Sequence, residues 1–312
     1  MLYLTTRNDK DAYTAARTLS LDSPTEGGFF VPYRLPVFSK EEIDSLKDKS
    51  FGETVSQILN LFFSLRLNGW DVDFSVGRNP TKLVLLNNKT VSAELWHNPN
   101  SDFDYVVQNL YRRVCTDAAR SATEWFSLAV RIAVLFALTG EMQRQEMITE
   151  QNITDIAVPG DDLAWCVAAL FAAKMGMPVK NIIFACSENA PLPELLRRCA
   201  VNTKAVTDQS GLERLICTGI STGDASRFAE ECNDSGTFTI SQTASSILNQ
   251  ILFTAAVGNS RISSVISSTH AINQYVIDRR TAMALAGIQD HRTGTGENRT
   301  VLFLSDVRPA QN

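Results

Sequence analysis

The sequence predicts an α/β protein with a partly parallel sheet. Residues 153–160 form a short apolar run that ends in Pro-Gly, and residues 161–176 have the composition of a helix that stops at Gly176. A second apolar run follows at residues 179–187. A strand, a turn, a helix and a strand in this order make a βαβ unit, whose two strands are parallel. The fold class is therefore α/β.

The other elements follow from periodicity and from turn and cap residues. Residues 23–39 are dense in Gly and Pro and predict an extended loop, after which Ser39 and Glu42 form the capping box of the first of two helices. Two strands are expected within residues 82–96, with Asn87-Asn88 as their turn. The remaining expected elements are strands at 73–77 and 299–306 and helices at 103–120, 126–138, 186–200, 240–257 and 278–291.

Composition excludes several classes of protein. The net charge of −5 and the lack of a basic stripe argue against nucleic-acid binding. No apolar segment follows a basic start at the N-terminus, so no signal peptide is expected. The apolar run 126–138 is too short to span a bilayer and contains Arg131, so we expect a buried core helix and no membrane partner. The six cysteines lack C-x-x-C spacing, which favours free thiols in the cytoplasm.

One short motif suggests a hydrolase. Residues 219–223 (GISTG) match the G-x-S-x-G pattern of a nucleophile elbow, with Ser221 as the nucleophile. Asp278 and His291 could complete a triad, but no His-Gly-Gly loop supplies oxyanion donors. A serine hydrolase that uses Ser221 is therefore a remote alternative.

The polar residues between the apolar runs have a plain structural interpretation. Asp161 and Asp162 open a helix, where they are expected to cap it and to complement its dipole. His97, Asp102 and Asp104 lack a second histidine at helical spacing, so no metal site is expected. His270 and His291 belong to no motif and are expected to be surface or packing residues.

Read together, several segments resemble threonine synthase, the pyridoxal-phosphate (PLP) enzyme that makes threonine from O-phosphohomoserine. The segments YLTTRND and EGGFFVPYRLP are similar to the start of that family, and ELWHNPNSDFDY is similar to its ELFHGPTxAFKD motif. Residues 157–185, DRRTAMA at 278–284 and LFLSDVRPAQN at 302–312 are similar to later motifs in the same order. The resemblance implies the tryptophan synthase beta-like fold, also called fold type II.

The departures from the family pattern lie at its functional positions. The resemblance aligns Asp104 with the lysine that holds PLP, and no lysine occurs between Lys89 and Lys174. Gly160, Asp161, Asp162 and Ala164 stand where the family has serine, glycine, asparagine and glycine. Asp306, Arg308 and Gln311 replace threonine, histidine and lysine, while Arg279 and Arg280 replace Pro-His. Because a carboxylate cannot hold an aldehyde, we expect no cofactor and no catalytic residue.

The resemblance also implies a shortened chain. After the helix that ends near Arg120 the sequence continues directly into a segment that resembles the region beyond the small cofactor-clamping domain. We therefore expect a threonine-synthase-type N-terminal domain at residues 1–90 and a truncated large α/β domain at residues 91–312, with the small domain deleted.

These departures lead to an expected function. We expect a catalytically inactive relative of threonine synthase with a binding or interaction role, in a homo-oligomer or with an enzyme of amino-acid metabolism. The alternative is a remodelled cleft that binds a small amine or amino acid, or that retains PLP-dependent lyase activity. The expected lining of this cleft is His97, Asp104, Gly160, Asp161, Asp162, Asp306 and Arg308.

Overall fold

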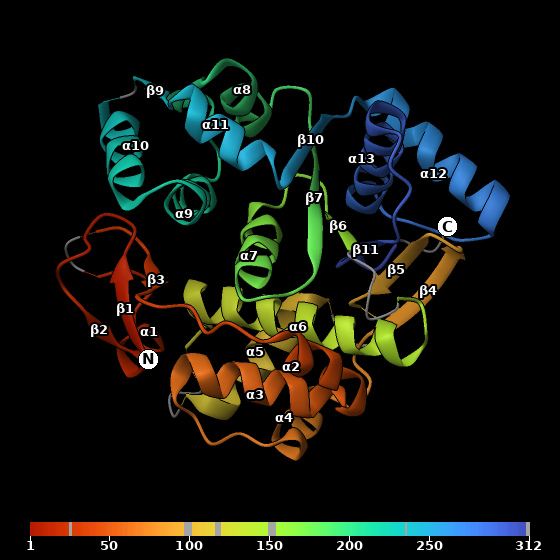
Figure 1. The fold of residues 1–312 in the computed structure, drawn as a ribbon, viewed down its shortest axis with the longest axis horizontal. Coiled ribbons are helices and arrows are strands. Elements are labelled where there is room, and N and C mark those ends of the chain that lie inside the picture. Colours follow the sequence, from red (N-terminus) through yellow and green to blue (C-terminus); the bar gives the residue numbers. More distant parts are fainter. Residues whose placement is uncertain (25–26, 97–101, 116–119, 149–153, 235, 310–312) are drawn as a thin grey trace.

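The computed structural model describes the chain except for residues 25–26, 97–101, 116–119, 149–153, 235 and 310–312. It opens with a small antiparallel sheet in the strand order β2-β1-β3, seen at the left of Figure 1. The strands are β1 (Leu2–Thr5), β2 (Tyr13–Thr14) and β3 (Phe30–Pro32). Short helix α1 (Ala15–Thr18) follows β2 directly.

A six-stranded mixed sheet in the order β10-β7-β6-β11-β5-β4 forms the centre of the larger part. All neighbours are parallel except β4 and β5, which form an antiparallel hairpin. The strands are β4 (Lys82–Asn87), β5 (Thr90–Glu94), β6 (Thr154–Val158), β7 (Val179–Cys186), β10 (Leu252–Ala256) and β11 (Val301–Ser305). The predicted α/β class is therefore confirmed.

Alternate residues of the central strands belong to two apolar clusters, one on each face of the sheet. Ile156, Val158, Ile182, Phe184, Leu302 and Leu304 belong to the first cluster. Ala157, Ile183, Ala185, Val301 and Phe303 belong to the second. Because successive side chains of a strand point to opposite faces, a continuous apolar run fills both layers.

Helices cover both faces of this sheet (Figure 1). Helix α7 (Leu163–Lys174) contacts β6 and β7 and packs on α6 (Glu124–Arg144), whereas α13 (Arg279–Thr295) contacts β6, β7, β10 and β11 from the other face and α12 (Asn259–Asn273) packs on it. Helix α6 is long and apolar enough to cross a membrane, but 83% of that window is buried inside the protein. It is a core helix, as predicted, and Arg131 lies within it.

Around α6 lie the remaining helices of the first half of the chain. Helix α3 (Phe51–Phe63) packs along α6, and α4 (Gly69–Val76) packs on α3 and on the helix at Phe103–Val114. The others are α2 (Lys40–Asp44), η1 (Ser45–Asp48) and α5 (Phe103–Val114). The β4–β5 hairpin spans residue 90, and the division into domains at that residue stays a prediction.

A long excursion separates the parallel neighbours β7 and β10. Its described residues form a two-stranded antiparallel sheet, four α-helices and one short 3-10 helix, which Figure 1 shows above the N-terminal strands. Its elements are α8 (Pro191–Arg198), β8 (Ala200–Asn202), η2 (Thr203–Ala205), α9 (Gln209–Gly219), α10 (Thr222–Asp234), β9 (Thr237–Thr239) and α11 (Gln242–Asn249). Buried Glu213 of α9 accepts hydrogen bonds from Thr6 and from Arg7, which joins the excursion to the N-terminal strands.

Several predicted elements differ from the structure. The strand expected at 73–77 is wrong, because Asn68 and Asp71 form a capping box that starts helix α4 there. The helix expected at 240–257 ends at Asn249, and its second half is strand β10. The Ser39–Glu42 capping box is confirmed, as is the hairpin at residues 82–96.

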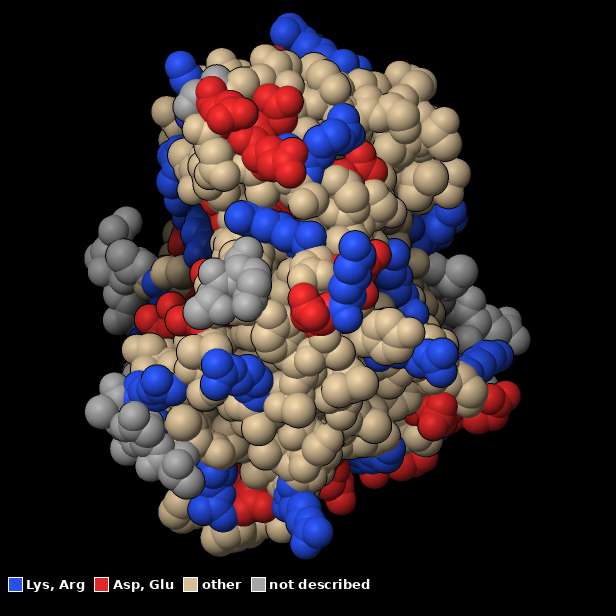
Figure 2. Space-filling model, turned by 90° about the vertical axis from the view of Figure 1, so that its left-hand side faces the viewer, with Lys and Arg blue, Asp and Glu red and all other residues tan. Residues whose placement is uncertain are grey.

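The surface in Figure 2 carries charges of both signs. Acidic side chains gather near its upper end, where helix α10 lies, and the sequence of that helix contains Asp224, Glu230, Glu231 and Asp234. Lys and Arg side chains are scattered below them on this face rather than joined into one band. All six cysteines are free, and Cys166 and Cys186 are buried.

Candidate functional site

The predicted site residues follow the carboxyl ends of the parallel strands. Gly160, Asp161 and Asp162 come directly after β6, and Asp306 comes directly after β11, its neighbour in the sheet. In open α/β sheets, ligands bind at this edge, where the connections diverge to opposite sides. Residues from separate parts of the chain are therefore brought together where a site is expected.

Arg280 is the centre of this group. Its guanidinium forms an ion pair with the Asp162 carboxylate and a second one with Asp306, whose Oδ2 lies 3.2 Å from Nη1. Its Nε also donates to the carbonyl oxygen of Gly160 at 3.4 Å. Burial acts to lower the pKa of Arg280, but the carboxylates of Asp306 and Asp162 outweigh it, so the pKa is raised. We call Arg280, Asp162 and Asp306 the Arg280 triad.

Asp306 is the least satisfied member of the Arg280 triad. The residue is 7% exposed, and its Oδ1 has no hydrogen-bond partner among the described residues. Burial raises the pKa of Asp306 to about 6, the charges of Asp162 and Asp278 act in the same direction, and Arg280 opposes them. A buried acceptor without a partner costs free energy, which a bound donor would recover.

The two aspartates after β6 accept hydrogen bonds from different parts of the chain. Asp162 is the N-cap of α7 and accepts a hydrogen bond from the Trp165 backbone N–H at 3.0 Å, so its predicted capping role is confirmed. Asp161 does not cap the helix. Its φ of +60° turns the side chain toward the end of β7, where Oδ1 accepts from the Ser187 N–H at 2.9 Å.

Gly160 lets the loop after β6 approach helix α13. Its N–H donates to the Arg280 carbonyl at 3.1 Å, and a Cβ at this position would lie 2.6 Å from Cβ of Met283. A side chain would therefore push α13, and Arg280 with it, away from the strand ends.

Asp104 lies beside this edge but points outward. Phe103 packs on Trp165 with 4.8 Å between ring centroids, so the start of α5 lies near the start of α7. The Asp104 side chain is 79% exposed, and its nearest described cation is Nη2 of Arg131 at 3.9 Å. Asp102 caps α5 by accepting from the Tyr105 N–H at 3.1 Å, which confirms its helix-start role.

Arg308 and His97 were also predicted to line the site. Arg308 is exposed beyond the end of β11. His97 lies outside the described residues. Of the predicted cleft, the structure brings together Gly160, Asp162 and Asp306.

Sequence reasoning missed the role of the residues that open helix α13. Asp278 is the N-cap of this helix and accepts from the N–H groups of Arg280 and Thr281. The Thr281 hydroxyl reaches Asp278 and lies 3.1 Å from Oγ of Ser305, which accepts from Trp96 Nε1 at 3.0 Å. The sequence pattern D-x-x-T at Asp278 and Thr281, directly before an apolar helix, would have predicted this helix cap.

A second polar group lies at the end of β5. Tyr275 donates its hydroxyl proton to Glu94 at 2.9 Å, and the same hydroxyl lies 3.0 Å from Oγ of Ser92. Lys82 of β4 is 4.0 Å from Glu94 and 52% exposed, which places one lysine at this corner of the sheet. Burial raises the pKa of Tyr275, so its hydroxyl stays protonated.

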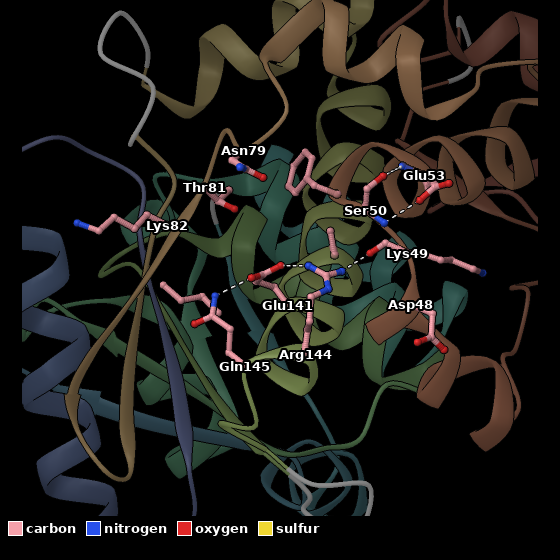
Figure 3. A pocket seen from close by; sticks show the side chains of 13 residues that line it. Asp48, Lys49, Ser50, Glu53, Asn79, Thr81, Lys82, Glu141, Arg144 and Gln145 are labelled. Carbon is pink, nitrogen blue, oxygen red and sulfur yellow. Dashed lines mark hydrogen bonds and ion pairs between the residues drawn. The ribbon is translucent and has the colours of Figure 1, made fainter.

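A pocket of about 620 Å³ lies elsewhere, between the start of α3, strand β4 and the end of α6. Figure 3 shows its polar lining, in which Arg144 pairs with Glu141 and donates to the Lys49 carbonyl. Its described lining residues contribute no buried polar atom that lacks a partner, whereas Asp306 does, so this pocket offers weaker ligand chemistry than the Arg280 triad.

The hydrolase alternative is contradicted by the structure. Residues 219–223 do not follow a strand, because Ser221 lies between helices α9 and α10. Asp278 and His291 flank three turns of the same helix and are about 20 Å apart along its axis. The Ser221 hydroxyl instead bonds Asp224, to which it donates at 2.6 Å.

Comparison with known proteins gives the fold class first. Three solved threonine synthases each match 99% of this chain. The enzyme of Brucella melitensis, with PLP bound, matches with a TM-score of 0.82 and 18% identity over 89% of its own chain. The yeast enzyme matches with a TM-score of 0.81 and 14% identity over 87% of its chain, and the Escherichia coli enzyme with a TM-score of 0.73 and 15% identity over 89% of its chain. A search of curated protein sequences finds no match. The chain therefore has the fold type II architecture of PLP enzymes.

The N-terminal part of the chain also matches a family model. Residues 2–72 match the family model described as the threonine synthase N terminus. Together with the fold of the whole chain, this match confirms the resemblance read from the sequence: the chain has a threonine-synthase-like fold. The deletion of a small domain and the cytoplasmic location stay predictions.

The expectation that this chain has no cofactor is contradicted by the comparison. A threonine synthase of the same fold has been solved with PLP bound, so PLP is the cofactor that the fold implies. The described residues do not form a cradle for its phosphate. Asp162 and Asp306 occupy the strand ends, and the one guanidinium between them is paired with both.

Proposed function

We propose that this threonine-synthase-like protein binds a small amine or amino acid at the Arg280 triad and does not catalyse threonine synthesis. The buried Oδ1 of Asp306, which lacks a described partner, supports this proposal most directly. An ammonium group carries three donors and a positive charge, which is the complement of an unpaired carboxylate oxygen.

The charge balance favours a cation over a phosphate. Asp162, Asp278 and Asp306 surround the single guanidinium of Arg280, and each of the three carboxylates raises its pKa. A phosphorylated substrate would add a dianion to this excess of negative charge. At about 8 Å from one carboxylate, the repulsion is about 4 kcal/mol at an effective dielectric of about 20.

The proposal of a catalytically inactive protein rests on Asp104. The resemblance to the family motif aligns this residue with the lysine that holds the cofactor, and a carboxylate cannot form an imine. Its side chain points to solvent rather than into a cavity, since it is 79% exposed.

Binding is tested by calorimetric titration of the purified chain with amino acids, simple amines, O-phosphohomoserine and inorganic phosphate. We expect heat of binding from an unphosphorylated amine and none from inorganic phosphate. In the variant Asp306→Asn the affinity should fall by about tenfold or more, because one charged hydrogen bond is lost. The exposed Arg308→Ala variant is the matched control and should bind as the wild type does. No response to any amine contradicts the binding role.

Catalysis is tested separately. The chain is incubated with PLP and O-phosphohomoserine, and threonine and phosphate release are measured. We expect neither product above the background without protein. Steady production of threonine would overturn the proposed inactivity. It would not change the conclusion drawn from the binding titration.

An interaction role is the second candidate, and one exposed pair of aromatic residues favours it. Trp70 and Phe74 of α4 are 63% and 71% exposed and stack with 5.3 Å between ring centroids. Large exposed aromatics of this kind are enriched at protein interfaces. Sedimentation of the wild type should show a homo-oligomer that the variant Trp70→Ser, Phe74→Ser dissociates, and a strictly monomeric wild type contradicts self-association.

A further inference from the structure

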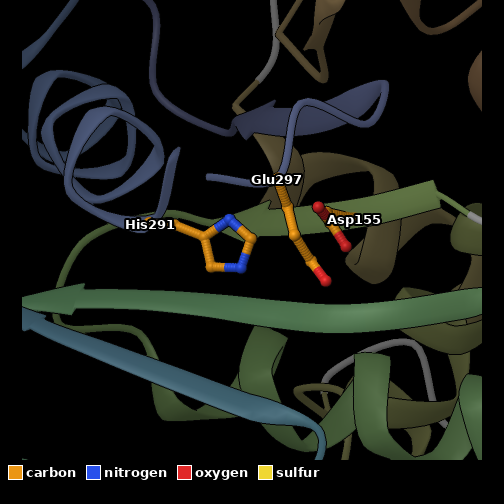
Figure 4. A group of neighbouring side chains, drawn as sticks. All are labelled: Asp155, His291 and Glu297. Carbon is orange, nitrogen blue, oxygen red and sulfur yellow. The ribbon is translucent and has the colours of Figure 1, made fainter. Parts of the chain in front are cut away.

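A buried histidine and two carboxylates meet at the opposite edge of the sheet from the Arg280 triad. Asp155 lies at the start of β6, His291 near the end of α13 and Glu297 in the loop that leads to β11 (Figure 4). The pairing of β6 with β11 brings them together, since the Asp155 N–H donates to the Thr300 carbonyl at 3.0 Å. One ligand atom from each residue lies within 4.8 Å of the other two.

His291 supplies the observation that points to a ligand. The residue is 2% exposed, and its Nδ1 has no hydrogen-bond partner among the described residues. The ring packs edge-on against Phe253, with 4.9 Å between centroids, and this contact fixes its orientation. A buried imidazole nitrogen without a partner is rare in native proteins, and a metal ion is one of the groups that satisfy it.

The two carboxylates are held in place by Asn181. Its N–H and its side-chain amide donate to Oδ1 of Asp155 at 3.1 and 2.9 Å, and the same amide reaches Oε2 of Glu297 at 3.3 Å. Each carboxylate therefore keeps a second oxygen, Oδ2 or Oε1, for another partner. Ligating carboxylates in metal sites are usually oriented by such outer hydrogen bonds.

We propose that Asp155, His291 and Glu297 bind a divalent transition-metal ion, and that this ion is Zn²⁺. One imidazole nitrogen and two carboxylate oxygens make a three-ligand set that leaves a fourth tetrahedral position for water. The nitrogen ligand favours Zn²⁺ or Co²⁺ over Ca²⁺ and Mg²⁺, which prefer oxygen alone. This site is independent of the proposed amine binding and departs from the sequence-based expectation of no metal.

The neighbouring charges set the expected affinity. Arg299 pairs with Glu297, and Arg292 interacts electrostatically with Asp155. Two arginines beside two carboxylates leave little net negative charge, so binding should be weaker than at an all-carboxylate or thiolate site. The ion would join the end of α13 to the start of β6 and so stabilise this edge of the sheet.

The test uses the full chain after removal of metal with EDTA. Thermal unfolding is followed during titration with Zn²⁺, and visible absorbance is followed during titration with Co²⁺. At a Zn²⁺ concentration about 100 times the dissociation constant, the melting temperature should rise by about 5 °C. Co²⁺ should give weak bands between about 500 and 650 nm, typical of nitrogen and oxygen ligands in a four-coordinate site.

Variants decide which residues hold the ion. Glu297→Gln changes a half-buried side chain and should fold, yet it should lose both the Zn²⁺ shift and the Co²⁺ bands. His291→Asn should lose them as well. The exposed His270→Gln on α12 is the matched control and should keep both.

Two results would overturn the proposal. One is the absence of a Zn²⁺ shift and of Co²⁺ bands in the wild type. The other is binding that persists unchanged in Glu297→Gln and in His291→Asn, because the ion would then be held by other residues.

Discussion

Arg280 at the start of α13 forms an ion pair with Asp306 at the end of β11, with 3.2 Å between Nη1 and Oδ2. The same guanidinium pairs with Asp162 at the start of α7. One side chain thus connects a helix on each face of the sheet with the end of a central strand. The strength of this connection depends on the protonation of Asp306, which makes its contribution dependent on pH.

The free energy of unfolding should fall between about pH 4 and pH 6 because of the ionisation of Asp306. Burial raises the pKa of this carboxyl from 3.8 to about 6, so the folded state keeps the proton when the unfolded state has lost it. Its contribution to stability is full below about pH 4 and is lost as the pH rises through 6, a change of about 3 kcal/mol.

The variant Asp306→Asn isolates this effect. It should match the wild type near pH 4 and be more stable by up to about 3 kcal/mol at pH 8, because no buried charge forms. Urea unfolding of both proteins at the two pH values measures the difference. A gap that is the same at both pH values contradicts the assigned pKa shift.

Removal of the Arg280 guanidinium should be costly. In Arg280→Met the carboxylates of Asp162 and Asp306, whose side chains are 14% and 8% exposed, lose their shared counter-ion. The unfolding free energy should fall by about 3 kcal/mol at pH 8 and by less at pH 5, where Asp306 takes up a proton. Arg308→Met, at an exposed position, is the control and should change stability by less than about 0.5 kcal/mol.

Gly160 and Gly294 should respond to alanine in opposite directions. A Cβ at Gly160 would lie 2.6 Å from Cβ of Met283, so Gly160→Ala should destabilise the fold by about 1–3 kcal/mol. Nothing lies within 4 Å of a Cβ at Gly294 in α13, so Gly294→Ala should stabilise it by up to about 1 kcal/mol. Denaturant unfolding of both variants provides the comparison, and equal effects would contradict the role given to Gly160.

Ser221 should act as a helix cap and not as a nucleophile. Its Oγ accepts from the Asp224 N–H at 3.0 Å at the start of α10. Ser221→Ala should therefore lower the unfolding free energy by about 1 kcal/mol. A serine-directed fluorophosphonate should not label the wild type, and stoichiometric labelling that Ser221→Ala abolishes would restore the hydrolase alternative.

Local signals in the sequence predicted much of the larger sheet. The βαβ unit at residues 153–187 and the β4–β5 hairpin depend on apolar runs and turns within short stretches, so they could be read directly. The strand predicted at 73–77 failed because the capping box at Asn68 outweighed the β-propensity of a few apolar residues.

The site was harder to predict because its contacts are distant in sequence. Asp162 and Arg280 are separated by 118 positions, and no local pattern in either segment predicts their ion pair. Asp306 was found through its resemblance to a family motif. Its burial and unpartnered oxygen depend on the packing of α13, which sequence reasoning did not supply.

The position of β11 has a consequence for how the chain reaches this structure. It is the last described strand in chain order, yet it lies between β6 and β5 in the middle of the sheet. Until residues 301–305 dock, the β4–β5 hairpin and the β6–β7–β10 group have no strand between them and expose two facing edges. Pairing over such sequence separations is slow, and unpaired edges invite association. We therefore expect newly made chains to be most prone to aggregation in the interval before β11 pairs with β5 and β6.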